Sequence, residues 1–508
     1  MTWSPLDVIA FVVFLLAVVG VSLYASRKEE TGEDYFLAGR GLSWWLIGFS
    51  LIASNISSEH FVGMAGAGFG EAGLAVASYE WIAAITLVVV AFVFLPLFLR
   101  VGIYTMPEFL EYRYGVVPRT VMAIYMMVAY VAVAMAAVLY AGAIGLHAIF
   151  GLDLLVGIWL IGLLAGAYTV YGGLKAVVWS DLLQGAALLA GGALVTGLAL
   201  SEVGGLQAFF DHNQSKLHMV LPGDHPDLPW TTLLAGIWIP NIFYWGFNQF
   251  ITQRTLGARS LAAGQRGIVF AACLKLVIPF IIVFPGIAAY QLYGGQIADG
   301  DQAYPTLIRH LVPMGLRGVL FAALFGAVMS SLDSMLNSAS TIFTIDIYER
   351  FLEPGATPRD LVRTGRLATG VFVLAACLLA PLPARFAGVY QYIQLIWGFI
   401  SPSVVTVFVV GLAVWRAPST AATTALVLGV PTYGLLLWWL PDEAFLNHMA
   451  VTVAVLTLVM LALTAISPLS EPRVLTRRTD VDLTPDPLAK AVGAVVVVAT
   501  IGLYVVFW

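Results

Sequence analysis

The chain has 508 residues, of which 60% are hydrophobic and only 10% are charged. A soluble protein of this length carries roughly 25% charged residues, so this composition excludes a water-soluble globule. The formal net charge is only -5 and the sequence has no basic block, which argues against nucleic acid as a partner.

The apolar residues gather in fourteen segments, most of them long enough to cross a bilayer as helices. These segments span residues 6–26, 44–70, 76–99, 121–150, 153–170, 178–200, 231–250, 268–293, 318–345, 367–385, 388–415, 420–440, 448–467 and 489–508. The first segment lacks a basic leader and a small-residue cleavage site, so we expect it to be retained as a helix. The sequence thus predicts an all-α polytopic membrane protein with about 14 transmembrane helices.

Cationic residues predict how the chain is oriented, because Lys and Arg favour the cytoplasmic side of a membrane. An even number of crossings puts both termini on one side. With that side outside, 19 Lys and Arg residues, among them Arg254, lie on the cytoplasmic side and 4 lie outside, while Lys275 is left within the membrane. The opposite orientation inverts the bias. We therefore predict a plasma (inner) membrane protein with both termini outside.

Two of the segments carry breaks at corresponding places. The second segment is interrupted by the polar run Ser-Asn-Ile-Ser-Ser at residues 54–58, and the seventh contains Pro240 followed by Asn241. Five segments separate the two starts, and because five is odd, the second group of five begins from the opposite face. This layout is typical of inverted repeats, in which substrate and ion bind at broken helices. Proline and glycine are also common in ordinary membrane helices, which is the alternative interpretation.

Glu80 and Lys275 are the most informative ionisable residues within apolar segments. A charge at the bilayer centre costs at least about 2.5–3.5 kcal/mol, so such residues usually face a cavity or a partner. A carboxylate accepts hydrogen bonds from sugar hydroxyls, and an ammonium donates one. We therefore predict a site for a hydroxyl-rich solute; a Glu–Lys pair that only ties two helices together is the alternative. Tyr244 and Trp245 offer ring faces for stacking, although core packing is the simpler interpretation of two aromatic residues.

The ninth segment carries small residues, most with hydroxyls, that recur at three- and four-residue spacing and so share one helical face. They are Ala327, Ser330, Ser331, Ser334 and Ser338. Such a face usually allows close helix packing. The alternative is a sodium site, because sodium is a hard cation that prefers oxygen ligands. Ser330 and Ser331 offer hydroxyls, and backbone carbonyls freed at Ala53 and Ile56 in the broken second segment offer more.

Six motifs stand in order along the chain, at residues 53–64, 79–81, 105–108, 244–256, 330–338 and 343–348. The first reads Ala-Ser-Asn-Ile-Ser-Ser-Glu-His-Phe-Val-Gly-Met, and the fifth reads Ser-Ser-Leu-Asp-Ser-Met-Leu-Asn-Ser. Together they resemble the solute:sodium symporter family, and its sodium/glucose cotransporter branch in particular. The resemblance covers nearly the whole chain.

The resemblance implies a LeuT-type core of two inverted repeats of five helices, with one helix before the core and three after it. The expected divisions are 1–43 (N-terminal helix and cytoplasmic loop), 44–200 (first repeat), 201–230 (extracellular loop), 231–416 (second repeat) and 417–508 (three accessory helices). The implied activity is uptake of a monosaccharide of the glucose or galactose type, driven by sodium entry through alternating access. No enzymatic activity is expected.

Carried over residue by residue, the resemblance also implies the sites. The main sodium site falls on Ala53, Ile56, Ala327, Ser330 and Ser331. The sugar contacts fall on His60, Glu80, Asn241, Lys275 and Gln394, and the gate falls on Tyr244 with Trp245 beside it. A second sodium site, present in some relatives, falls on Asp181, Asp333 and Ser334.

Departures from the family pattern leave two details open. His60 stands where bacterial galactose-type members tend to have Gln and the animal glucose transporters have His, and Ala83 replaces a Ser hydroxyl of a bacterial member. Both glucose and galactose therefore remain open. Asp333 replaces a hydroxyl residue at the second sodium site, so one or two sodium ions per cycle both remain open.

Two other functions suit the same residues. The scaffold also suits another small polar solute, such as myo-inositol, sialic acid or an amino acid, although Glu80 disfavours a carboxylate substrate. A sugar sensor that binds without turnover is the second alternative. The expected partners are a small-molecule sugar, the sodium ion and the lipid bilayer, and both a monomer and a homodimer remain open.

Overall fold

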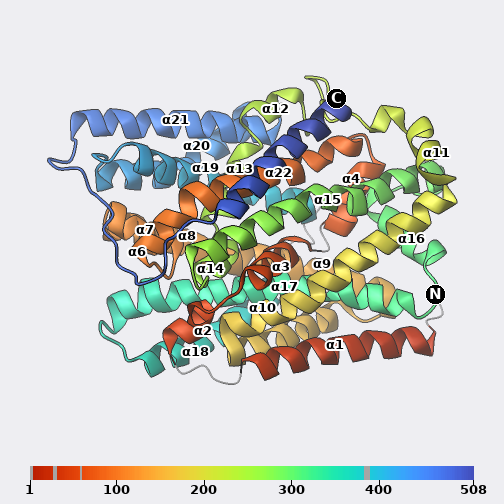
Figure 1. Cartoon of the computed structure of the whole chain (residues 1–508), viewed down its shortest axis with the longest axis horizontal. Helices are drawn as coiled ribbons and strands as arrows, with labels where there is room; N and C mark the ends of the chain where they lie inside the picture. Colours follow the sequence, from red (N-terminus) through yellow and green to blue (C-terminus); the bar gives the residue numbers. More distant parts are fainter. Residues whose placement is uncertain (1–3, 27–30, 58–59, 383–388) are drawn as a thin grey trace.

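The computed structural model describes residues 4–26, 31–57, 60–382 and 389–508, and these residues form helices without a β-strand. The helices are α1 (Pro5–Ala25), α2 (Gly32–Leu37), α3 (Trp44–Asn55), α4 (Ala65–Phe69), α5 (Ser78–Val89), α6 (Leu95–Val101), α7 (Met106–Arg113), α8 (Val116–Val128), α9 (Met135–Phe150), α10 (Leu154–Glu202), α11 (Gly205–His212), α12 (Trp230–Leu234), α13 (Trp238–Ile242), α14 (Gln249–Leu256), α15 (Leu261–Tyr293), α16 (Ala303–Leu311), α17 (Leu316–Ile342), α18 (Pro358–Leu379), α19 (Val389–Ala413), α20 (Ser419–Trp439), α21 (Phe445–Ile466) and α22 (Pro487–Val506). Most of the long helices run roughly along the long axis of the molecule (Figure 1).

Eleven helical spans within the described residues are long and apolar enough to cross a membrane, which makes the chain a multi-pass α-helical membrane protein. Two of the predicted segments, 44–70 and 231–250, are not among these spans because each is broken into shorter helices. Two others, 153–170 and 178–200, follow each other in α10, where Gly173 has a non-helical backbone (φ 49°, ψ -148°), so α10 consists of two helices that meet at a kink. The sequence pattern therefore marks the apolar stretches, but not which of them are broken into shorter helices.

Short helices also lie outside the apolar spans. The predicted loop 201–230 contains α11, whose Phe209 packs against Phe284 of α15 with ring centroids 4.9 Å apart. The predicted N-terminal loop contains α2, which begins with a capping box: the Thr31 hydroxyl accepts from the Asp34 N–H, and the Asp34 carboxylate accepts from the Thr31 N–H. Both regions therefore carry helices of their own.

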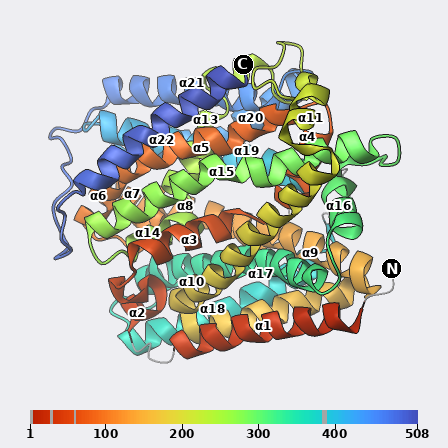
Figure 2. The same ribbon diagram turned by 45° about the vertical axis from the view of Figure 1, so that its right-hand side comes forward.

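Residues near both termini form hydrogen bonds with distant segments of the chain. The Asp7 carboxylate accepts from the Gly315 N–H at 2.7 Å, and the Met219 N–H donates to the Phe507 carbonyl at 2.7 Å. Figure 2 shows α11 and α16, which lead into these contacts, at one end, and α2, α6 and α7 at the other. Both termini therefore lie at the end that holds α11 and α16. Arg40, one of the predicted cytoplasmic cations, follows α2 at the opposite end.

The span that contains α17 is the most completely buried, whereas α1 lies at the edge of the packing. In the span Leu316–Leu352, 89% of the most apolar stretch is buried, against 17% in α1. Helix α17 packs against α10, and α3 packs against both α10 and α15. The approach of α10 to α3 depends on Gly185, where a Cβ would lie only 2.9 Å from the Ala53 Cβ. Long helices therefore hold the broken helix α3 with its unwound end in the protein interior.

Candidate functional site

The first break separates α3 from the short helix α4. Ile56, directly after α3, has an extended backbone (φ -76°, ψ 105°), and His60–Met64 forms a π-helical turn. The Ser57 N–H, which would bond the Ala53 carbonyl in a continuous helix, instead donates to Nδ1 of His60 at 3.4 Å. The last carbonyls of a helix have no helical donors. Ala53 and Ile56 are buried, and the N–H groups that would bond their carbonyls in a helix donate elsewhere, since the His60 N–H donates to the Ser57 carbonyl at 3.1 Å.

The second break lies between α13 and α14. Phe243–Phe247 forms a π-helical turn, and Asn248 is extended (φ -84°, ψ 120°). Pro240 lies within α13 and has no N–H to donate to the helix. The Tyr130 hydroxyl donates to the Asn248 side-chain oxygen and accepts from the Phe250 N–H at 3.4 Å. A side chain from a different part of the chain thus holds the extended residue in place.

A cavity of about 130 Å³ is lined by residues from both breaks. This is roughly ten times the space that one water molecule requires, so the cavity has room for a solute larger than water. Its polar lining includes His60, Glu80 and Asn241, and its aromatic lining includes Tyr244 and Trp245. The cavity therefore combines hydrogen-bonding groups with apolar ring faces.

Four residues make up what we call the cavity cluster: Asn55, His60 and Glu80, which line the cavity, and Lys275 behind them. The Lys275 Nζ is 2.5 Å from Glu80 Oε2, and His60 Nε2 is 3.6 Å from Glu80 Oε1. Lys275 also donates to the Asn55 side-chain oxygen and lies 4.9 Å from the centroid of the Trp245 ring. Glu80 lines the cavity, whereas Lys275 is fully buried behind it. The Glu–Lys pair of the alternative interpretation is thus present, and it stands at the cavity wall.

Aromatic residues of the second break form another part of the wall. Tyr244 contacts Trp245 and Phe250 edge to face, with ring centroids 5.2 and 5.4 Å apart. Asn241, which precedes them on α13, donates to the Ile237 carbonyl at 2.9 Å. The amide and the two cavity-lining rings therefore belong to one short stretch of chain.

The residues of the predicted main sodium site lie where α17 passes the first break. The Ser331 hydroxyl donates to the Ser54 carbonyl at 3.4 Å, and both residues line the cavity. The buried residues of the set are Ala53, Ile56, Ala327, Ser330 and Ser331. Neutral carbonyl and hydroxyl oxygens in a region shielded from water suit a sodium ion. The Ser330 hydroxyl, however, donates to Asp181 Oδ1 at 2.5 Å.

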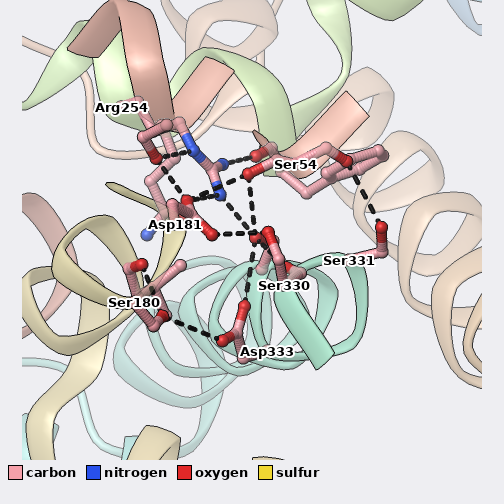
Figure 3. A network of polar contacts seen from close by, with 12 residues as sticks. Ser54, Ser180, Asp181, Arg254, Ser330, Ser331 and Asp333 are labelled. Carbon is pink, nitrogen blue, oxygen red and sulfur yellow. Dashed lines mark hydrogen bonds and ion pairs between the residues drawn. The ribbon is translucent and has the colours of Figure 1, made fainter. Parts of the chain in front are cut away.

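A second polar cluster adjoins the first break, and we call it the Asp181 cluster (Figure 3): Asp181, Arg254, Ser330, Asp333 and Ser334. At its centre the Asp181 carboxylate accepts from the Ser50 hydroxyl, from Ser54 at 3.1 Å and from Ser330 at 2.5 Å. The Arg254 guanidinium forms an ion pair with this carboxylate, with Nη2 3.2 Å from Oδ2. The buried carboxylate thus has both a charge partner and hydroxyl donors.

Arg254, which the orientation count placed on the cytoplasmic side, lies in the protein interior rather than at the surface. Its side chain is only 1% exposed, because α14 packs between α3 and α17 and carries the guanidinium into the interior. There it also donates to the Ser50 hydroxyl at 2.5 Å and to the Ser334 hydroxyl. An arginine at the end of an apolar segment is therefore not always a loop residue.

Asp333 brings a second buried carboxylate into the Asp181 cluster. It accepts from the Tyr168 hydroxyl, from Ser180 at 3.4 Å and from Ser334 at 3.3 Å. Among the described residues, none of the ion pairs includes Asp333. Two carboxylates therefore share one guanidinium in this cluster. An excess of buried negative charge is costly unless a cation or a proton joins it.

The structure brings most of the predicted residues into these two clusters or onto the cavity wall. Of the predicted sugar contacts, His60, Glu80 and Asn241 line the cavity, and Lys275 lies behind Glu80. Gln394 lies on α19, but its side chain is outside the described residues.

Sequence reasoning missed several residues in or next to these sites, and three of them are instructive. Asn55 belongs to the polar run at 54–58, so a polar side chain at a predicted helix break could have indicated it as a site residue. Arg254 lies inside the motif at 244–256, and its place in a family motif could have indicated a functional role. Tyr130 carried no local signal, because its bond to Asn248 joins residues 118 positions apart. Only the folded chain shows that contact.

The sequence pattern of the sodium:solute symporter family matches residues 35–429. The chain belongs to the sodium:solute symporter family. This symporter is 40% identical to the sodium/glucose cotransporter of Vibrio parahaemolyticus, over 99% of this chain and 98% of that one. It is 36% identical to sodium/myo-inositol cotransporter 2 of Sus scrofa, over 84% of this chain and 69% of that one.

A solved structure shows the same fold. It is a sodium-coupled sialic acid symporter in a substrate-bound, outward-open state, with a TM-score of 0.82 at 24% identity, over 92% of this chain and 99% of that one. Family membership makes this chain a transporter rather than an enzyme. It also makes sodium the ion on which the symporter depends.

Proposed function

We propose that this symporter couples sodium entry to the uptake of a monosaccharide of the glucose or galactose type by alternating access. The observation that carries the proposal is the cavity at the two breaks, where His60, Glu80 and Asn241 face the same space. These groups together accept and donate hydrogen bonds, as sugar hydroxyls require. The relative that is 40% identical over 99% of this chain is named a sodium/glucose cotransporter, which supports the same substrate class.

The charge balance of the cavity wall favours a neutral solute over an anion. Glu80 and Lys275 form a neutral pair, and Glu80 is the member that lines the cavity. A carboxylate substrate such as sialic acid would face this carboxylate directly. Lys275 would reach the solute from behind Glu80, and Gln394 would add an amide from α19. myo-Inositol, named for a relative 36% identical, also offers only hydroxyls and belongs in the same test.

Sodium would bind where α17 passes the end of α3. Its proposed ligands are the carbonyls of Ala53, Ile56 and Ala327 and the hydroxyls of Ser330 and Ser331. Support comes from the unwound end of α3 and from the Ser331 hydroxyl, which lies 3.4 Å from the Ser54 carbonyl. Ser330 would exchange its bond to Asp181 for one to the ion. Ser331 also lines the solute cavity, so the two sites would adjoin.

A second sodium would bind at Asp181, Asp333 and Ser334. The excess carboxylate of the Asp181 cluster supports a cation there, because Arg254 supplies only one positive charge. The alternative is that Arg254 already serves as the resident cation and that one sodium moves per cycle. Reversal potentials measured at several sodium gradients separate the two cases.

We further propose that the chain crosses the membrane fourteen times, with both termini outside. Residues 44–200 and 231–416 would form two inverted repeats. Support comes from the two breaks, which occur near the start of each repeat, and from the termini lying at one end of the molecule. Counting α10 as two crossings and each broken stretch as one raises the eleven continuous spans to this number. Tyr244, with Trp245 beside it, would close the cavity on the cytoplasmic side.

Counterflow in proteoliposomes tests the proposal. The panel consists of labelled D-glucose, D-galactose, myo-inositol and sialic acid, each in sodium and in choline buffer. We expect exchange of a neutral hydroxyl-rich solute in sodium only, and equal uptake in both buffers would contradict sodium coupling. A potential of 100 mV supplies about 2.3 kcal/mol per charge, and a tenfold gradient adds about 1.4 kcal/mol. One sodium per solute would therefore concentrate it roughly 10²–10³-fold, and two would roughly square that.

A further inference from the structure

The outer face of α18 carries a row of exposed apolar residues, which we call the α18 stripe: Leu367, Val371, Leu374 and Leu378. Their spacing of four, three and four residues places them on one side of the helix. Their exposed fractions lie between 46% and 70%, whereas the opposite side of α18 is buried against α10 and α17. Arg363, four residues before Leu367, lies on the same side and is also exposed. The stripe therefore faces away from the protein and has a charged end.

The α18 stripe has the length of one leaflet of a bilayer. The distance from Leu367 to Leu378 along the helix axis is roughly 16 Å, at 1.5 Å per residue. This is about half of the ~30 Å hydrocarbon core. An acyl chain of one leaflet can therefore lie along the stripe with its headgroup at the level of Arg363. Under the proposed orientation, that leaflet is the cytoplasmic one.

Positive charge gathers at this end of α18, which packs against α2 at the end of the molecule opposite the termini (Figure 2). Arg359, Arg363 and Arg366 are spaced by four and three residues, so they share one side of the helix. Within the part of the chain that the structure describes, no ion pair includes any of the three. The carboxylate of Asp360 is used in the capping box with Thr357. The first turns of α18 therefore carry an excess of positive charge.

Arg366 is held in place by two neighbouring helices. Its Nη2 donates to the Tyr171 carbonyl at 3.2 Å, and its guanidinium carbon lies 5.8 Å from the centroid of the Tyr35 ring. Tyr171 precedes the kink of α10 at Gly173, and Tyr35 belongs to α2. A guanidinium carries five N–H donors, and the bond to Tyr171 uses one of them. Arg366 therefore has a fixed position and retains donors for an anion.

We propose that this end of α18 binds an anionic phospholipid, with its phosphate at Arg359, Arg363 and Arg366 and an acyl chain along the α18 stripe. Guanidinium groups bind phosphate through paired, charge-assisted hydrogen bonds. Basic residues between helices at the cytoplasmic side of a membrane bind anionic headgroups in the same way. None of the residues that line the solute cavity belongs to α18, so the lipid site is separate from the proposed solute and sodium sites. A bound lipid would stabilise the junction of α18, α10 and α2.

The test follows the melting temperature of the purified full-length protein in detergent during titration with dioleoylphosphatidylglycerol. Dioleoylphosphatidylcholine, which has the same acyl chains but no net charge, and inorganic phosphate are the comparison ligands. We expect phosphatidylglycerol to raise the melting temperature at concentrations where the other two leave it unchanged, because a ligand of the folded state stabilises it. Equal stabilisation by phosphatidylcholine would show that the headgroup charge is not recognised. Equal stabilisation by phosphate would show that the occupant is not a lipid, and either result overturns the proposal.

Variants assign the effect to the arginines. A cationic residue at an anionic lipid surface contributes roughly fivefold in affinity, so Arg363→Gln should raise the phosphatidylglycerol concentration for half-maximal stabilisation about fivefold. Arg359→Gln/Arg363→Gln should raise it about 25-fold. The midpoint of the titration is compared, so a variant that melts lower without lipid still reports.

Arg309→Gln is the matched control, because Arg309 is an exposed arginine of α16 at the other end of the molecule. It removes the same charge and should leave the midpoint unchanged. An unchanged midpoint in Arg359→Gln/Arg363→Gln would overturn the proposal. A shift in Arg309→Gln as large as that in Arg363→Gln would also overturn it, because the lipid would then respond only to the net charge of the protein.

Discussion

Two buried polar clusters lie beside the unwound end of α3, and they differ in charge and in surroundings. The cavity cluster sets one carboxylate, Glu80, against one ammonium, Lys275, and opens onto the cavity. The Asp181 cluster sets two carboxylates against the guanidinium of Arg254, and none of its members lines that cavity. One cluster is balanced and open, while the other is unbalanced and closed.

The difference in charge balance and in access to the cavity indicates which buried charges are able to bind a solute. In the open cluster a hydroxyl-rich solute can replace part of the contact between Glu80 and Lys275, so the charges are not left unpaired when the pair loosens. In the closed cluster every partner is another protein group, so the loss of one leaves an uncompensated charge. Under the proposed function, the first cluster therefore binds solute, and the second contributes to stability and to cation affinity.

The largest expected effect is loss of the Asp181 cluster's guanidinium. Arg254→Met leaves two buried carboxylates without a cation, which should cost about 3–5 kcal/mol of stability. Thermal melts in detergent should show a large fall in melting temperature. Arg350→Met is the matched control, since its ion pair with Glu111 joins side chains that are 41% and 21% exposed and should contribute little. Equal melting of Arg254→Met and wild type would show that the cluster does not depend on this charge.

The next largest effect is expected on sugar binding at the cavity cluster. Glu80→Gln and Lys275→Met should each weaken sugar binding, because a hydrogen bond to a charged group is typically worth about 1.5–3 kcal/mol, or roughly 10- to 150-fold in affinity. Folding and insertion should be kept.

A purely structural ion pair makes the opposite forecast for these two residues. Each single change would then destabilise the protein, and the double variant Glu80→Gln/Lys275→Met would recover both stability and uptake. Melts of the three variants, with and without sugar, distinguish the cases. Recovery of sugar-induced stabilisation in the double variant would rule out sugar contacts here.

A smaller effect is expected at Tyr244, which shares the cavity wall but carries no charge. Tyr244→Phe keeps the ring contacts with Trp245 and Phe250, whereas Tyr244→Ala removes them. Aromatic contacts are worth about 0.5–1.5 kcal/mol beyond their burial, so transport should fall roughly 2- to 12-fold more in the Ala variant than in the Phe variant. Uptake rates from proteoliposomes provide the measurement. A wild-type rate in Tyr244→Ala would mean that the ring only fills the core.

The smallest effect is expected between the two clusters, at Ser331. Ser331→Ala removes one proposed ligand oxygen and should raise the sodium concentration for half-maximal uptake about fivefold, corresponding to about 1 kcal/mol. Ser338→Ala is the matched control, because Ser338 lies farther along α17 and donates to Gln253 at 2.8 Å. Equal sodium dependence in the two variants would remove Ser331 from the ligand set.

Sequence and structure agree where the signal is local and differ where it is not. The polar run at 54–58 and the serines of the ninth segment suggested carbonyls of Ala53 and Ile56 near serine hydroxyls. In the structure the Ser331 hydroxyl donates to the carbonyl of Ser54, which lies between those two residues. Whether Glu80 and Lys275 meet was left open, because the two residues are 195 positions apart. That Lys275 lies behind Glu80 and also reaches Asn55 required the packed helices.

The sequence by itself determined the all-helical, multi-pass class and the places where two helices break. Both follow from local chemistry: the length of apolar runs, and polar or helix-breaking residues within them, although Pro240 itself lies within α13 and the extended residue of the second break is Asn248. Only the tertiary structure decided that the two helices of α10 meet at a kink at Gly173, that Arg254 is buried and that Tyr130 holds the second break. The physical reason is that buried polar groups must be satisfied by whatever lies near them in space. Those partners come from helices far apart along the chain.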